Sequence, residues 1–210
     1  MFTKALHPDT LRALKLISNI DLVKKSYLAG GTALALHLGH RISVDLDFFT
    51  PIALDENVLA SSLKEIPGFV EEGKAWRTVW GNVENTKFSL FFYQYPLINE
   101  TTSFEGVPIS SKEDIAAMKI HAIEDRGTKR DFIDLYFLSK EFSLKEMLKF
   151  YNQKYGVLNE HLYSIIRSLD YFTDAEIDPD PQMLIPVSWS EVKNFFKEKS
   201  MDLAKNELKI

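Results

Sequence analysis

Two short motifs constrain this chain most, one rich in glycine and the other in aspartate. Gly30-Gly31-Thr32 is followed by a run of strong helix formers that ends at Gly39, a residue type that commonly terminates helices. Residues 43–50 then alternate apolar and polar side chains, which is typical of a strand and points Asp45 and Asp47 to one face. The sequence therefore predicts a glycine turn, a helix capped by Thr32, and a strand that presents two carboxylates.

The two motifs share a chemical use. Glycines let the backbone approach a phosphate, and the N–H groups at a helix N-terminus favour negative charge. Paired carboxylates hold Mg²⁺ or Mn²⁺, and metal ions there would support in-line displacement at a phosphoryl group. Each motif alone is common as an ordinary turn or a solvated strand face. Together they predict phosphoryl transfer without a protein nucleophile.

Composition excludes several classes of protein. With 45% hydrophobic and 12% aromatic residues in 210, the chain has enough apolar side chains for a sizeable core. The absence of cysteine excludes disulfides and zinc–thiolate sites. A formal charge of −5 argues against a broad basic surface for nucleic acid, although a local basic cleft remains open. We expect a cytoplasmic protein with no membrane partner, because residues 1–10 lack a signal-peptide pattern.

The hydrophobic periodicity predicts an α+β fold with two parts. The first, residues 1–110, would form a mixed β-sheet with flanking helices, and the second, residues 111–210, would be helical. In the first part we expect helices at 8–17 and 55–66, a strand at 26–29, and two or three antiparallel strands in 69–97 with a turn at Gly81-Asn82. In the second we expect helices from Ser111 and at 130–140, 143–155, 159–169 and 188–208.

A second group of charged residues lies in the helical part. Lys119 and Arg126 are seven positions apart on one helical face, and with Lys129 and Arg130 they would form a basic cluster for a triphosphate or an RNA end. Three positions separate Asp131 from Asp134, so one of them could pair with a lysine or arginine while the other orients the site. The alternative is a surface network of ion pairs.

The two groups together resemble a known family. The segments that carry the resemblance are Gly30-Gly31-Thr32-Ala33-Leu34, His40-Arg41-x-Ser43-x-Asp45-Leu46-Asp47-Phe48-Phe49, and Lys119-x-x-Ala122-x-x-Asp125-Arg126-x-x-x-Arg130-Asp131-x-x-Asp134-Leu135. They are similar to the signature of the AbiEii/AbiGii toxins, which belong to the polymerase-beta-like nucleotidyltransferases. The resemblance spans residues 30–138, about half of the chain. It implies the toxin of a toxin–antitoxin system, with an NTP donor, Mg²⁺, a cognate antitoxin and, in some members, tRNA as the acceptor.

From the residues and the resemblance we predict a site with three kinds of residue. The predicted metal ligands are Asp45 and Asp47, and the catalytic set adds Lys119 and Asp131. The predicted nucleotide- and phosphate-binding residues are Gly30, Gly31, Thr32, Arg41, Ser43, Arg126 and Arg130. Residues 1–110 would form the nucleotidyltransferase core, and residues 111–210 would complete the active-site cleft. The predicted reaction is NMP transfer from an NTP to an acceptor hydroxyl, the tRNA 3′ end.

Two alternatives remain open at this point. The acceptor could be a protein side chain or a small molecule, or the chain could be a non-catalytic relative that binds a nucleotide or a partner. Members of the superfamily commonly carry a third carboxylate on a neighbouring strand, whereas residues 87–91 offer Ser89 there. A single Mg²⁺, or help from Asp131, would then replace the usual two-metal site.

Overall fold

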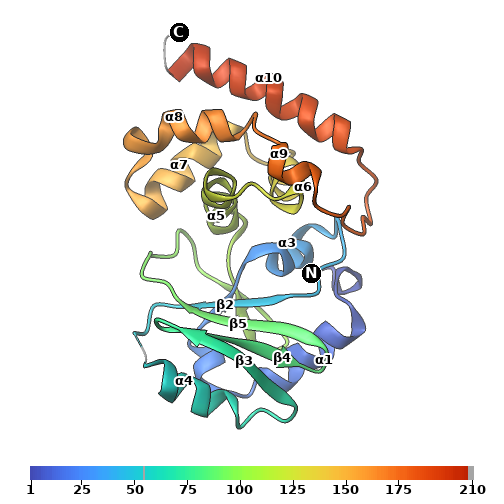
Figure 1. The fold of residues 1–210 in the computed structure, drawn as a ribbon, viewed down its shortest axis with the longest axis vertical. Helices are drawn as coiled ribbons and strands as arrows, with labels where there is room; N and C mark the ends of the chain where they lie inside the picture. Colours follow the sequence, from blue (N-terminus) through green and yellow to red (C-terminus); the bar gives the residue numbers. More distant parts are fainter. Residues whose placement is uncertain (54, 208–210) are drawn as a thin grey trace. The chain divides into compact units, whose positions relative to one another are not determined.

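The computed structural model describes residues 1–53 and 55–207, which fall into two compact units divided after Ser111 (Figure 1). The first unit holds a mixed sheet with helices, and the second is built from helices. The predicted α+β fold class is confirmed. None of the helices among the described residues is long and apolar enough to cross a membrane.

The described part of the first unit contains one seven-stranded sheet, with the strand order β3-β4-β5-β2-β1-β7-β6. Its pairs are antiparallel except for β2 with β5 and β1 with β7, which are parallel. The strands are β1 (Tyr27–Leu28), β2 (Leu46–Thr50), β3 (Phe69–Ala75), β4 (Thr78–Val83), β5 (Thr86–Phe92), β6 (Thr102–Phe104) and β7 (Val107–Ile109). This order places β2 near the middle of the sheet.

Short helices lie against this sheet. In Figure 1, α3 and α4 lie on opposite sides of it. The helical segments are η1 (Thr3–Ala5), α1 (Pro8–Ile17), α2 (Asp21–Lys24), α3 (Gly30–Leu38) and α4 (Glu56–Leu63). Leu59 and Leu63 of α4 are buried, as are Leu46 and Phe48 of β2. Alternate residues of β2 therefore belong to the core, and the residues between them are left for the other face.

The predicted turn at Gly81-Asn82 is wrong, since both residues lie inside β4. The chain turns instead at residues 76–77 and 84–85, where Arg77, Glu84 and Asn85 have positive φ angles of 51°, 53° and 67°. A Cβ on Gly81 would lie 2.2 Å from the carbonyl oxygen of Val70. The glycine thus permits close approach of β3 to β4, which is the other common use of glycine in a strand.

The second unit consists of helices that begin and end close to the predicted positions. They are α5 (Lys112–Asp125), α6 (Lys129–Leu138), α7 (Leu144–Tyr155), α8 (Leu158–Ser168), α9 (Thr173–Glu176) and α10 (Trp189–Glu207). The short α9 was not predicted, and Leu208, where the last helix was predicted to end, lies outside the described residues. Phe132 of α6 packs against Phe172, Trp189 and Phe196, which joins α10 to the core of this unit.

Candidate active site

The N-terminus of α3 brings the glycine motif beside an acidic residue of β2. Gly30 begins the helix with a positive φ of 65°, a conformation that glycine adopts without strain. A Cβ at this position would lie 3.6 Å from Oδ2 of Asp47. The carboxylate of Asp47 therefore packs directly against the first turn of α3.

The prediction that Thr32 caps this helix is wrong. The N-cap is Ala29, whose side chain makes no capping hydrogen bond. The hydroxyl of Thr32 instead contacts the carbonyl oxygen of Asp45 and lies 2.9 Å from Oγ of Ser43. Thr32 thus ties α3 to the segment that leads into β2.

The acidic strand is shorter than predicted. It begins at Leu46, so Asp45 lies just before it. The preceding residues bond elsewhere, because the amide of Ser43 donates to the carbonyl of Ala5 at 2.9 Å. The exposure alternates only from Asp45 onward, with Asp45 and Asp47 half-buried and the intervening Leu46 fully buried, whereas Val44 is exposed. Both aspartates are therefore partly exposed.

Ser89 occupies the neighbouring position on β5. In the parallel pair of β2 with β5, Asp47 is in register with Ser89, so both side chains lie on the same face of the sheet. The position expected for a third carboxylate is therefore next to Asp47 and holds a hydroxyl. A hydroxyl is a much weaker ligand for Mg²⁺ than a carboxylate. This face therefore offers a metal fewer protein ligands than a site with three carboxylates would.

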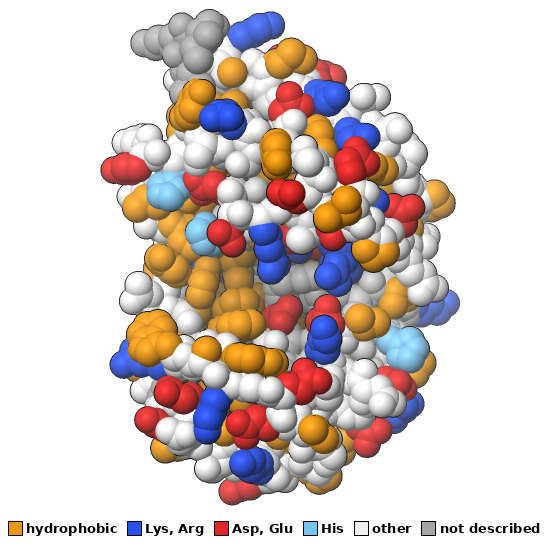
Figure 2. All heavy atoms as spheres, in the orientation of Figure 1, with side chains coloured by type: hydrophobic (Ala, Val, Ile, Leu, Met, Phe, Trp, Pro, Cys, Tyr) orange, Lys and Arg blue, Asp and Glu red, His pale blue; other side chains and the backbone are white. Residues whose placement is uncertain are grey.

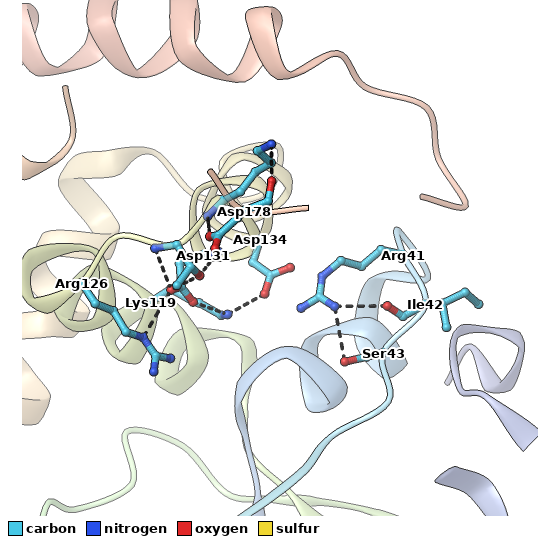
Figure 3. Close-up of polar contacts among 10 residues, drawn as sticks. Arg41, Ile42, Ser43, Lys119, Arg126, Asp131, Asp134 and Asp178 are labelled. Atoms are coloured by element: carbon cyan, nitrogen blue, oxygen red, sulfur yellow. Dashed lines mark hydrogen bonds and ion pairs between the residues drawn. The ribbon is translucent and has the colours of Figure 1, made fainter. Parts of the chain in front are cut away.

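Four predicted phosphate-binding residues form what we call the Arg41 cluster: Gly31, Thr32, Arg41 and Ser43. Arg41 is only 3% exposed, and its Nη1 donates to Oγ of Ser43 at 3.3 Å and to the carbonyl of Ile42 at 3.2 Å (Figure 3). A Cβ on Gly31 would lie 2.2 Å from Nη2 of Arg41. The guanidinium is thus held against the first turn of α3. Sequence reasoning missed this burial, since an arginine in a turn is usually solvated.

Lys119 of α5 lies between two aspartates of α6. Its Nζ is 2.8 Å from Oδ1 of Asp131 and 2.6 Å from Oδ2 of Asp134, and all three side chains are buried (Figure 3). Asp131 also accepts hydrogen bonds from Thr128 in the capping box of α6. Burial alone would raise the pKa of Asp131, but Lys119 and Thr128 hold its pKa below the ordinary value. The carboxylate of Asp131 is therefore charged at neutral pH.

The basic cluster predicted around Lys119 is only partly present. Lys129 is buried, and its Nζ lies 2.7 Å from the carbonyl of Asp178 and 3.0 Å from Asp180, so that ammonium fixes the segment before α10. The side chain of Arg126 is 67% exposed, with Nε 3.8 Å from Asp131. Arg130 is exposed as well. Arg126 and Arg130 remain candidates for phosphate contacts. Lys129 is no longer a candidate, because Asp178 and Asp180 already bind its ammonium.

The residues near β2 fit a divalent cation bound largely through a substrate. Within residues 1–53 and 55–207 there is no group of three or more His, Asp or Glu side chains able to hold a metal. Asp45 and Asp47 supply hard oxygen ligands, and Mg²⁺ commonly takes one or two carboxylates and fills its remaining positions with phosphate oxygens and water. The donor set therefore suits Mg²⁺ in the presence of a nucleotide.

A mixed sheet with acidic residues beside a glycine-led helix defines the class, that of the nucleotidyltransferases. The family described as "Nucleotidyl transferase AbiEii toxin, Type IV TA system" matches residues 12–103 and 92–205. The chain belongs to this family, and it is a nucleotidyltransferase. An uncharacterized protein of Aquifex aeolicus (strain VF5), aq_aa25, is 35% identical over 211 residues, covering 97% of this chain and all of that protein.

Solved structures share the fold. MenT4, a nucleotidyltransferase toxin from Mycobacterium tuberculosis H37Rv, superposes with a TM-score of 0.53 at 17% identity, covering 97% of this chain and 88% of that one. The antibiotic-resistance factor ANT(2'')-Ia superposes with a TM-score of 0.54 at 14% identity, covering 74% of this chain and 98% of that one. At these identities the likeness concerns the fold.

Substituting Gly31 with alanine tests the Arg41 cluster. The new Cβ would displace the guanidinium, which is buried and has little room to move. We expect the affinity for NTP to fall about tenfold, the usual worth of one or two charge-assisted hydrogen bonds to phosphate. Titration of NTP against the purified variant measures this. In an Arg41→Ala background the same substitution should have no further effect; an additive loss would show that Gly31 acts independently of Arg41.

Proposed function

We propose that this chain transfers NMP from an NTP to a 3′-hydroxyl of RNA, the tRNA 3′ end being the leading acceptor, in a reaction that requires a divalent metal. The acceptor oxygen bonds to the α-phosphorus, the bond to pyrophosphate breaks, and the hydroxyl proton passes to water. A metal held by Asp45 and Asp47 would neutralise phosphate charge and help to orient the acceptor. The antitoxin of the same system is the proposed protein partner.

The observation that carries this proposal is the contact of Asp47 with the first turn of α3. It places a carboxylate able to bind a metal beside the N-terminal turn of α3, where backbone N–H groups favour phosphate. We propose that Gly30, Gly31 and Arg41 bind the phosphates of the NTP. Thr32 and Ser43 would hold that guanidinium in place, through the hydrogen bonds that join them.

The roles proposed for the second unit differ among its residues. Lys119 and Asp131 are buried and paired with each other, so their proposed contribution to transfer is to position the exposed Arg126. Arg126 and Arg130 would contact phosphates of the substrates. A Lys119→Met variant that folds normally but transfers NMP at the wild-type rate would remove Lys119 and Asp131 from this proposal.

Metal dependence and acceptor are tested in one experiment. The purified chain is incubated with Mg²⁺, total tRNA and each of the four α-labelled NTPs in turn, with and without excess chelator. We expect label on RNA from at least one NTP, and we expect excess chelator to abolish it. The metal would be bound jointly by two carboxylates and a polyphosphate, and a chelator competes effectively with such a site. Label that persists in chelator would contradict the metal requirement.

Other outcomes point to other functions. If the nucleotide binds and label appears on added protein or on a small molecule but not on RNA, the acceptor is that molecule and not RNA. The charge of −5 makes this the nearest alternative, since RNA affinity depends on cationic contacts. Thermal stabilisation by NTP and Mg²⁺ without transfer to any acceptor would indicate a binding protein, as Ser89 in the place of a carboxylate would permit.

A further inference from the structure

Phe49 of β2 and Phe91 of β5 lie on the same face of the sheet as Asp47 and Ser89, and Tyr93 and Tyr95 follow shortly after β5. We call Phe49, Phe91, Tyr93 and Tyr95 the aromatic strip. Their ring centroids lie 5.2 Å apart for Phe49–Phe91, 5.1 Å for Phe49–Tyr93 and 5.0 Å for Tyr93–Tyr95. All four side chains are half-buried. The strip is thus a continuous set of rings that the described chain leaves partly uncovered.

The strip is not needed to fill the core of the sheet. Phe48, Phe88 and Leu90, which alternate with Phe49 and Phe91 along β2 and β5, are fully buried on the opposite face. Contiguous apolar area that stays partly exposed can mark a binding surface. The aromatic rings of the strip would therefore suit a ligand with flat apolar faces.

The strip is continuous with the candidate active site. Phe49 follows Asp47 by two residues on β2, and Phe91 follows Ser89 by two residues on β5, a distance of about 7 Å along each strand. This is close to the spacing of successive nucleotides in a single strand. β1 is antiparallel to β2 with Tyr27 opposite Phe49, so Gly30 lies beyond Asp47, at the end away from the strip. Phosphate-binding glycines and aromatic rings thus flank the carboxylate on opposite sides.

From this arrangement we infer that the aromatic strip binds the unpaired bases at the 3′ end of the acceptor RNA by stacking. The inference rests on the proposed function and specifies the acceptor side of the same site. The rings lie about 5 Å from one another in one group, so consecutive bases of a strand can contact several of them, whereas an NTP offers a single base.

The net charge means that RNA, if it binds here, needs a contribution other than phosphate neutralisation. The face shown in Figure 2 carries acidic and basic side chains interspersed, without a broad basic area, and the net charge is −5. Phosphate neutralisation alone would then hold RNA weakly. Base stacking depends little on net charge and accepts any base, so the strip supplies affinity that the rest of the surface lacks.

The test measures binding of a short labelled single-stranded RNA to the full chain, without NTP. Phe49→Leu and Phe91→Leu keep apolar volume and remove the ring, and we expect each to weaken binding about tenfold. Phe69→Leu is the matched control, because Phe69 is a half-buried phenylalanine of the same sheet that contacts the core ring of Phe88. An RNA whose last two nucleotides are abasic should bind the wild-type chain as weakly as the intact RNA binds the variants, a measurement that needs no variant to fold.

The outcomes separate this inference from the proposed function. Equal binding of intact RNA by the wild-type chain and both variants, or of intact and abasic RNA by the wild-type chain, would overturn the inference while RNA transfer could still occur. A higher KM for NTP with unchanged RNA binding would assign the rings to the donor base and also overturn it. If the two variants and the abasic RNA lose binding as expected but no NMP reaches RNA, the strip is an RNA-binding surface and the proposed transfer is wrong.

Discussion

Replacing Asp47 with asparagine should lower the rate of NMP transfer about a thousandfold or more, with the fold unchanged. The substitution keeps the shape of the side chain beside Gly30 and removes the charge. Metal binding between carboxylates and phosphates stabilises developing charge by several kcal/mol, and about 1.4 kcal/mol corresponds to a factor of ten. Transfer of labelled NMP under saturating NTP gives the rate directly.

The same variant should unfold at nearly the wild-type temperature. Asp47 is half-buried, and substitutions outside the core change stability by about 0.5 kcal/mol or less, about 2 °C in a chain of this length. Asp21→Asn, an exposed carboxylate at the start of α2, is the matched control and should keep full activity. If Asp47→Asn transfers NMP at a rate within tenfold of wild type, the metal is not held by this carboxylate and the site assignment fails.

Local sequence signals predicted those parts of the site that depend on neighbouring residues. Gly39 ends α3 in the left-handed conformation, as predicted, because glycine adopts a positive φ of 65° without strain. The period of two correctly gave a half-buried Asp47 between the buried Leu46 and Phe48 of β2, whereas Val44, on the other side of Asp45, is exposed. Register with β5 then placed Ser89 beside Asp47, on the neighbouring strand where a third carboxylate was expected. These features follow from rules that act within a few residues or along one strand.

The errors arose where tertiary partners decide. Thr32 was predicted as a cap, but its hydroxyl contacts Ser43 and Asp45, more than ten positions away. Gly81 was predicted as a turn, but it allows the close approach of β3. Lys129 was placed in a basic cluster, whereas Asp178 and Asp180 take its ammonium. No local pattern contains these partners, so a single sequence could not reveal them.

Burial of charge in the second unit was missed for the same reason. Asp114 lies in the first turn of α5 and follows Ser111 by three residues, a spacing typical of a helix start. In the structure its carboxylate lies 2.7 Å from Nζ of Lys154 on α7, and both side chains are fully buried. With the pairing of Lys119 to α6, this contact means that α5 is joined to both neighbouring helices by buried ion pairs. Such pairs favour one register of packing, because any other arrangement would leave a buried charge uncompensated.

Replacing Lys154 with methionine should therefore be strongly destabilising. The variant leaves the carboxylate of Asp114 buried without its ammonium, a change that costs about 3–5 kcal/mol and should lower the melting temperature by about 10 °C or more. Thermal unfolding followed by circular dichroism measures the shift. Lys145→Met is the matched control on the same helix, because Lys145 is 68% exposed and its pair with Glu207 should contribute about 1 kcal/mol or less.

The double variant Asp114→Leu/Lys154→Met distinguishes lost attraction from uncompensated charge. It fills the site with apolar side chains of similar volume and should recover most of the stability that Lys154→Met alone loses, because the desolvated charge is gone. A double variant less stable than Lys154→Met would mean that the two charged side chains have further polar partners in the core of this unit. Recovery would instead indicate that the pair is retained for the register of α5 on α7, and that the stability of the helical unit does not depend on it.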